Sequence, residues 1–197
     1  MGKIWSIILA AGESKRMGFP KMILEFKGKT MIENVILNVA DSKSDYTLVV
    51  LGANKENIIA IIGNYDIKYC YNEYYKEGML SSVQCGFKNL PSKFEAALVF
   101  QGDQPLISPS VIDSLINRYR STDKGIIIPV YKGKRGHPLL LDSKYRDEID
   151  KLDPDEGLRS ISYINPGDVL EVDTDDPGIL RDFDTYDEYK KELNQTL

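Results

Sequence analysis

Short apolar runs alternate along the chain with stretches whose apolar residues recur every three or four positions. The runs predict strands buried on both faces, and the recurring pattern predicts amphipathic helices. The expected strands are 3–10, 46–52, 67–71, 96–103, 125–131, 137–141 and 168–173. The expected helices are 30–40, 54–63, 80–90, 108–120, 142–150, a segment from Leu158 and a segment from Thr185. This alternation predicts a doubly wound, mainly parallel α/β sheet.

Two local signals refine the expected order of elements. Thr30 followed by Glu33 forms a capping box at the start of the helix 30–40. Pro138 has no backbone N–H to donate to a ladder, so the strand 137–141 is expected at an edge of the sheet.

Composition narrows the class of protein. A length of 197 residues fits one domain, 1–197, and a net charge of −5 argues against nucleic-acid binding. No apolar run reaches the roughly 18 residues needed to span a bilayer, so no membrane partner is expected. Two cysteines outside any CxxC motif, with no signal peptide, predict a cytoplasmic protein. The single histidine, His137, excludes His-rich metal sites, so any metal is expected to be a hard cation on carboxylates.

Against this acidic background, three cations gather in the loop 9–21, LAAGESKRMGFPK, directly after the first predicted strand. Its glycines let the backbone approach a ligand, and consecutive N–H groups can form an anion-binding nest. Arg16 can contact two phosphate oxygens at once, and Lys21 can act as a point charge. The loop matches neither the Walker A motif nor GxGxxG. It predicts a phosphate site, with a solvated basic loop, including Lys15, as the alternative.

Asp103 ends the fourth predicted strand, beside Gly102. A carboxylate at that place suits a Mg²⁺ ligand, and the alternative is a turn aspartate that caps its own backbone. Ligands of open α/β sheets bind beyond the carboxyl ends of the strands. We therefore expect the loop 9–21, the hydroxyls of Ser81 and Ser82, and Asp103 to converge, although the serines could also simply cap their helix.

The aspartate-rich segment from 173 to 187 offers a second carboxylate for Mg²⁺. Most of its acids are expected to be solvated or to cap helices, and spacing alone leaves Asp173, Asp182 and Asp184 as alternatives. Arg135 and His137 flank a glycine in GKRGHP, where a packed or surface imidazole is as plausible as a functional one.

Together these motifs resemble a known family. LAAGESKRMGFPK, GMLSS, GDQP, RGHP, DEG and DFDT occur in the order and spacing of the MobA-like nucleotidyltransferases, over essentially the whole chain from Ile4 to Tyr189. The chain is most similar to the MocA-type branch, the molybdenum cofactor cytidylyltransferases. The resemblance implies a Rossmann-like, three-layer α/β/α fold of the nucleotide-diphospho-sugar transferase type. It also implies an enzyme that joins an NTP to a phosphorylated acceptor and releases pyrophosphate.

The resemblance further implies roles for individual positions. The implied catalytic residues are Arg16, Lys21 and Asp103, and the implied Mg²⁺ ligands are Asp103 and Asp184. The implied nucleotide-binding positions are Leu9, Ala10, Ala11, Gly12, Lys15, Arg16, Lys21, Gly78, Ser81, Ser82, Gly102 and Asp103. The implied acceptor-binding positions are Gln104, Arg135, Gly136 and His137.

Ala11 favours CTP, because the guanylyl-transferring relatives usually read LAGG where this chain reads LAAG. The implied acceptor is then molybdopterin, the product is the cytosine dinucleotide cofactor, and a molybdenum hydroxylase apoenzyme is the implied partner. The chain departs from the family pattern at Phe19-Pro20, where small residues are common, and at Tyr186, where proline is common.

Other functions stay open at this stage. Within the same fold, the nucleotide could be GTP, or the acceptor a sugar phosphate or alditol phosphate. A non-catalytic chaperone that delivers cofactor to a molybdenum hydroxylase is an alternative of another class. An NAD(P)-dependent oxidoreductase is disfavoured because its GxGxxG fingerprint is absent from the sequence.

Overall fold

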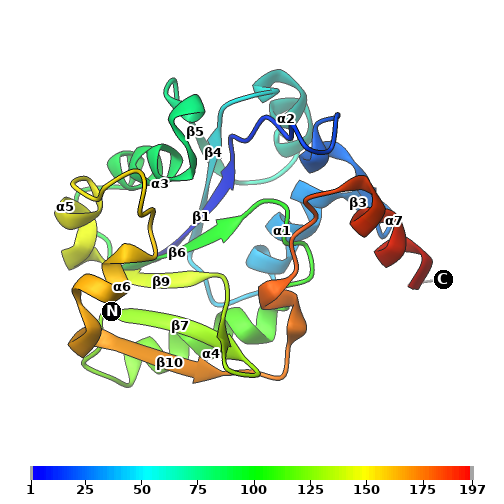
Figure 1. Ribbon diagram of the computed structural model, residues 1–197. Helices are drawn as coiled ribbons and strands as arrows, with labels where there is room; N and C mark the ends of the chain where they lie inside the picture. The colour runs from blue at the N-terminus through cyan, green and yellow to red at the C-terminus, as the bar shows by residue number, and fades with distance from the viewer. Residues whose placement is uncertain (1, 196–197) are drawn as a thin grey trace.

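The computed structural model describes residues 2–195, in which eight strands form one sheet of order β10-β7-β9-β6-β1-β4-β5, with β8 against β7 (Figure 1). The strands are β1 Ile4–Ala10, β4 Tyr46–Leu51, β5 Lys68–Tyr71, β6 Ala96–Gln101, β7 Ile126–Tyr131, β8 Lys134–Arg135, β9 Leu139–Asp142 and β10 Val169–Asp173. β6, β1, β4 and β5 are parallel, and so are β7 and β10. The predicted mainly parallel sheet is confirmed.

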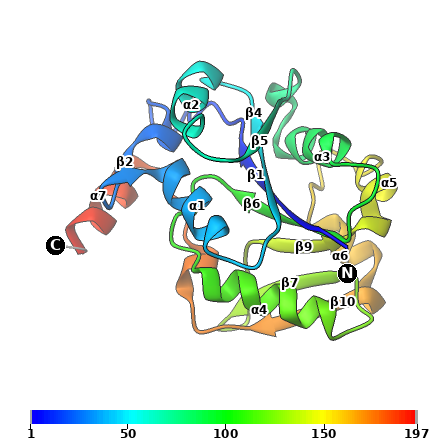
Figure 2. The ribbon, with the colours of Figure 1, turned by 180° about the vertical axis from the view of Figure 1, so that it is seen from behind.

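Helices cover both faces of this sheet (Figures 1 and 2). They are α1 Met31–Ala40, α2 Lys55–Ile62, α3 Met79–Asn89, α4 Pro109–Arg120, α5 Arg146–Ile149, α6 Ser160–Ile164 and α7 Tyr186–Gln195. Side chains of β1 alternate between the two faces, so that Ile4 and Ile8 pack with α1, α2 and α4, whereas Trp5 and Ile7 pack with α3, α5 and α6. In the described residues no helix has both the length and the apolar character required to cross a bilayer.

The two local signals had different outcomes. The capping box is confirmed, since the N–H of Glu33 donates to the Thr30 hydroxyl and the Glu33 carboxylate accepts from the Thr30 N–H. The edge position expected for the strand after Pro138 is wrong. β9 lies between β6 and β7 and is antiparallel to both. Pro138 does not interrupt the ladder, because β9 begins one residue later at Leu139.

A third apolar cluster joins the opening loop to the end of the chain. It contains Met17, Phe26, Met31, Phe183 and Tyr189. A small hairpin made of β2 (Glu25–Phe26) and β3 (Lys29–Thr30), which the sequence pattern did not predict, contributes to it. Both ribbon views show α7 beside this hairpin (Figures 1 and 2). The last helix therefore packs against the loop that follows β1 rather than against the sheet.

Phe19 and Tyr186, one residue from each of the two departures from the family pattern (Phe19-Pro20 and Tyr186), contact each other. Their rings meet edge to face, with 5.4 Å between centroids and 74° between planes. Tyr186 also lies against Tyr189, at 5.8 Å between centroids. An aromatic residue at each position thus fastens the start of α7 to the loop 9–21. We call this pair the aromatic latch (Phe19 and Tyr186).

The aromatic latch predicts energetic coupling between distant parts of the chain. Replacing Phe19 and Tyr186 by alanine, singly and together, should reveal a coupling of about 0.5–1 kcal/mol in the free energy of unfolding, since partly exposed aromatic pairs stabilise by amounts of that order. Urea unfolding of the four proteins measures it. Phe19→Ala combined with Tyr69→Ala, on the exposed side of β5, is the matched control and should be additive. Additivity of the Phe19 and Tyr186 variants would contradict the latch.

Candidate active site

The ammonium group of Lys21 lies between two carboxylates from distant parts of the chain. It forms one ion pair with Asp103, two residues beyond β6, and another with Asp184, at 3.2 Å between Nζ and Oδ1. Arg16 reaches the other oxygen of Asp184, at 2.8 Å between Nη2 and Oδ2. The first loop, the end of β6 and the segment before α7 therefore meet in one charged group. We call it the Lys21 cluster (Arg16, Lys21, Asp103 and Asp184).

The Lys21 cluster runs from a buried interior to an exposed rim. The exposed fractions are 7% for the Asp103 side chain, 13% for Lys21, 27% for Asp184 and 73% for Arg16. Burial opposes the charge of Lys21, but the two carboxylates outweigh it and raise its pKa above the ordinary value. Partial desolvation, together with the charges of Asp184 and Asp103, raises the pKa of the nearby Asp182. Lys21 thus stays cationic at neutral pH despite its burial.

Ser14 shapes the loop that carries these cations. Its carbonyl accepts from the N–H groups of Met17 and Gly18, at 3.0 and 3.2 Å, and its hydroxyl accepts from the N–H of Lys21 at 3.1 Å. Ser14 and Gly18 both adopt positive φ, at 54° and 78°. The resulting tight turn brings the backbone of Lys21 back toward the end of β1. Ser14 was not among the predicted site residues, because no motif or apolar pattern marks it.

A cavity of about 240 Å³ opens beside the Lys21 cluster at the carboxyl ends of β1 and β6. Its walls are formed by Leu9, Ala11, Gly12, Lys21, Met22, Tyr75, Gly78, Met79, Ser82, Gln101 and Asp103. We call it the β1 cavity. This is the place where open α/β sheets bind their ligands. Seven of the positions predicted to bind nucleotide are therefore brought together around one space.

Ser81 and Ser82, adjacent residues of α3, line different cavities. Ser82 lines the β1 cavity, and its hydroxyl accepts from the Asn72 amide at 3.0 Å. Ser81 accepts from the same amide at 2.9 Å, but its own hydroxyl lies 2.9 Å from the Tyr74 carbonyl and 2.8 Å from that of Gly78. Ser81 lines a separate cavity. Ser82 is thus available to a ligand of the β1 cavity, whereas Ser81 holds the turn before α3.

Gln101 connects the β1 cavity to His137. Its side-chain amide donates to His137 Nε2 at 2.9 Å, which places the ring proton on Nδ1. Desolvation lowers the pKa of His137, so the ring is neutral at pH 7. Gln104, and not Gln101, was the glutamine predicted to bind the acceptor. The period of two along a strand would have indicated Gln101, since it lies two residues before Asp103.

Arg135 and Gly136 have structural partners of their own. The Arg135 guanidinium pairs with Glu171, at 2.6 Å between Nε and Oε1, and donates to the Ser162 hydroxyl at 3.3 Å. A side chain at Gly136 would overlap the backbone carbonyl of Ile179, so only glycine fits there. These contacts seat the turn before His137 against the segment that follows β10.

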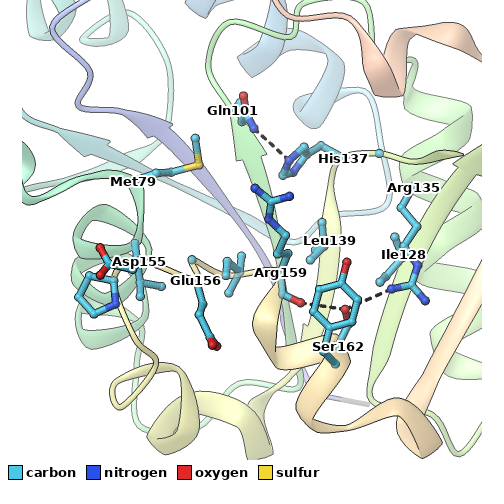
Figure 3. A pocket seen from close by; sticks show the side chains of 16 residues that line it. Met79, Gln101, Ile128, Arg135, His137, Leu139, Asp155, Glu156, Arg159 and Ser162 are labelled. Carbon is cyan, nitrogen blue, oxygen red and sulfur yellow. Dashed lines mark hydrogen bonds between the residues drawn. The ribbon is translucent and has the colours of Figure 1, made fainter.

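A second cavity, of about 520 Å³, lies between α6 and β9 (Figure 3). We call it the α6 cavity. It shares Met79 and Gln101 with the β1 cavity, so the two spaces adjoin. Arg135, Gly136 and His137, predicted to bind an acceptor, all line it. Arg159, which the sequence analysis did not single out, also points into it.

Besides Arg16, Ser81 and Asp184, four predicted site positions line neither of these two cavities. Lys15 is 78% exposed and pairs with Glu13 at 2.9 Å. Ala10 is buried within β1, and Gln104 is buried beyond β6. Gly102 packs closely against neighbouring side chains and the backbone of β1. These positions support the surrounding structure, or, in the case of Lys15, face the solvent.

The donor set of the Lys21 cluster fits a hard divalent cation. Asp103 and Asp184 direct carboxylate oxygens at one point, and that point holds the positive charge of Lys21. In the described part of the chain no group of three or more His, Cys, Asp or Glu side chains converges as a metal site. Two carboxylates are enough for Mg²⁺, which keeps several waters and takes its other ligands from substrate phosphates. Asp103 and Asp184 are the residues that would hold it.

Comparison of the sequence with known proteins identifies the family of this chain. A family model described as the MobA-like NTP transferase domain matches residues 6–168. A probable molybdenum cofactor guanylyltransferase from Natranaerobius thermophilus is 33% identical over 130 residues, which are 65% of this chain and 60% of that protein. A protein of the same description from Methanosarcina mazei is 26% identical over 184 residues, covering 85% of this chain and 80% of that protein. The chain thus matches less than two thirds of the first relative's length.

Solved structures share the fold. The crystal structure of Rv0371c from Mycobacterium tuberculosis superimposes with a TM-score of 0.84 at 22% identity, covering 98% of each chain. The same mycobacterial protein has a structure in complex with manganese, at a TM-score of 0.77 and 20% identity, over 98% of each chain. The likeness in fold agrees with the family match, which spans most of the sequence. The chain belongs to the MobA-like NTP transferase family.

Proposed function

We propose that this protein transfers a nucleotidyl group from an NTP, with CTP as the preferred donor, to the phosphate of a molybdopterin-type acceptor. The observation that carries this proposal is the Lys21 cluster, in which a buried cation and two carboxylates border the β1 cavity. Support for the acceptor comes from the family and from relatives described as molybdenum cofactor guanylyltransferases.

The reaction requires little covalent chemistry from the protein. An oxygen of the acceptor phosphate attacks the α-phosphorus of the NTP, and the bond to the bridging oxygen of the β-phosphate breaks as pyrophosphate leaves. The attacking phosphate is already ionised at neutral pH, so no general base is needed. Catalysis then depends on positioning the reactants and neutralising their charge.

The Lys21 cluster supplies both requirements. Lys21 is held in place by Asp103 and Asp184, and Arg16 lies at the exposed rim of the same cluster. Cations at these places stabilise the charge that develops on pyrophosphate. Asp103 and Asp184 would hold a Mg²⁺ ion in place of the Lys21 ammonium group, which would then pair with the triphosphate, and the metal would supply further neutralisation of phosphate charge. Manganese in the complex of the mycobacterial protein, which shares this fold, supports a divalent cation here.

The choice of base rests on Ala11. Ala11 is one of the residues that line the β1 cavity, and its Cβ lies against Gly52, just after β4, where it takes up space that a glycine would leave open. A smaller cavity favours the pyrimidine of CTP over a purine. GTP is the second candidate, because the curated relatives are described as guanylyltransferases.

Removing the charge of Asp103 tests the proposed centre. Asp103→Asn should lower pyrophosphate release, measured with the preferred NTP, Mg²⁺ and molybdopterin, by about 10²-fold or more, since a preorganised charge at the transition state contributes on that order. Asp147→Asn, on the exposed face of α5, removes the same charge far from the cavity and should keep wild-type turnover. Circular dichroism and thermal unfolding establish that both variants are folded. A folded Asp103→Asn protein with wild-type turnover would overturn the assignment.

A nucleotide panel tests the base preference. Wild-type protein should show its largest thermal shift and highest kcat/KM with CTP among CTP, GTP, UTP and ATP, each with Mg²⁺, because a specific ligand stabilises the folded state. Ala11→Gly should move the preference toward GTP by enlarging the β1 cavity. A wild-type preference for GTP would reject the cytidylyl assignment and leave nucleotidyl transfer intact. A protein that binds NTP but releases no pyrophosphate with the acceptor would instead support a chaperone.

A further inference from the structure

We propose that Arg159 binds the attacking phosphate of the acceptor at the junction of the β1 and α6 cavities. This inference rests on the proposed function and adds to it a residue that selects a phosphomonoester. The acceptor's phosphate must reach the α-phosphorus of a nucleotide in the β1 cavity. Met79 and Gln101, which line both cavities, mark where that approach takes place.

The side chain of Arg159 is aimed at this junction. Figure 3 shows its guanidinium extending into the α6 cavity, toward Gln101 and His137, whereas the Glu156 carboxylate points away from them. Within residues 2–195, Arg159 forms no ion pair. An arginine without a protein anion, directed into a cavity, is suited to take two oxygens of a phosphate.

Arg135 serves as the internal comparison. It lines the same cavity, but its guanidinium is engaged by Glu171 at 2.6 Å and by the Ser162 hydroxyl at 3.3 Å. Its charge is therefore already compensated. Of the two arginines in the α6 cavity, Arg159 is the one with its hydrogen-bonding capacity open to a ligand.

The contacts of Arg135 with Glu171 and Ser162 also hold the backbone that carries Arg159. Ser162 donates to the Arg159 carbonyl at 2.8 Å and accepts from Arg135. Gly157, with a φ of 69°, forms the turn just before it. The pair between Arg135 and Glu171 thus anchors the base of the Arg159 side chain through Ser162. Preorganisation of this kind reduces the ordering cost of binding.

The remaining walls suit the body of a larger acceptor. Ile128 and Leu139 form an apolar part of the α6 cavity, and Tyr163, which is 66% exposed, offers a ring at its mouth. These surfaces can pack against a planar or apolar group, while Arg159 takes the phosphate. The class of acceptor is accordingly a phosphomonoester with a partly apolar ring system. Arg159 also offsets the repulsion between the acceptor phosphate and the NTP as the new bond between phosphate oxygen and α-phosphorus forms.

Binding and turnover together test this role. Fluorescence titration of wild-type protein with molybdopterin and with its dephosphorylated form should show tighter binding of the phosphorylated form by at least about 10-fold, since hydrogen bonds to charged groups contribute on that scale. Arg159→Gln should abolish this difference and raise the KM for molybdopterin. Its KM and thermal shift for the NTP should stay unchanged. Arg159→Lys should restore part of the preference, and Arg118→Gln, an exposed arginine of α4, should behave as wild type.

The outcomes separate this inference from the proposed function. An Arg159→Gln protein that keeps the preference for the phosphorylated acceptor overturns the role of Arg159, even when wild-type protein releases pyrophosphate. Wild-type protein that binds the phosphorylated form through Arg159, but releases no pyrophosphate with any NTP, overturns the proposed function and leaves the phosphate site standing. Equal binding of both forms by wild-type protein also overturns the inference.

Discussion

The burial of the Lys21 charge is the constraint on which the site depends. Removing an ammonium group from water costs several kcal/mol unless anions compensate it. Asp103 and Asp184 provide that compensation, and they come from the end of β6 and from the segment before α7. The first loop, the middle of the sheet and the end of the chain must therefore assemble together. The same charge compensation leaves a cation and two carboxylates beside the β1 cavity. A cation can bind a polyphosphate, and two carboxylates can bind its metal ion.

Contacts of residues outside the Lys21 cluster stabilise this arrangement. Ser14 turns the loop so that Lys21 points inward, and the contact between Phe19 and Tyr186 fastens α7 to it. Phe19 and Tyr186, one residue from each departure from the family pattern, are thus in contact with each other. Gln101 lines both cavities, and its side-chain amide donates a hydrogen bond to His137, which lines the α6 cavity. The β1 and α6 cavities are thus distinct but adjoin at Met79 and Gln101.

The fold class could be predicted from the sequence, because strand–helix alternation and strongly apolar strands are local signals. The prediction failed at Pro138, because the strand begins one residue later and occupies the middle of the sheet. Lys21 and Asp103 were identifiable from loop chemistry and position. Ser14 and Arg159 were not, since their contributions arise from a positive φ and from the direction of a side chain. Such features depend on tertiary packing, which no local pattern encodes.

A crystal structure of the protein with CTP or GTP and Mn²⁺ would test the proposed site most directly. We expect metal bound by Asp103 and Asp184, phosphate oxygens on Lys21 and Arg16, and the nucleoside in the β1 cavity beside Ala11 and Ser82. Lys21 would then have exchanged its carboxylates for the triphosphate. A nucleotide bound elsewhere, with Lys21 still paired to both aspartates and no metal on them, would contradict the central claim.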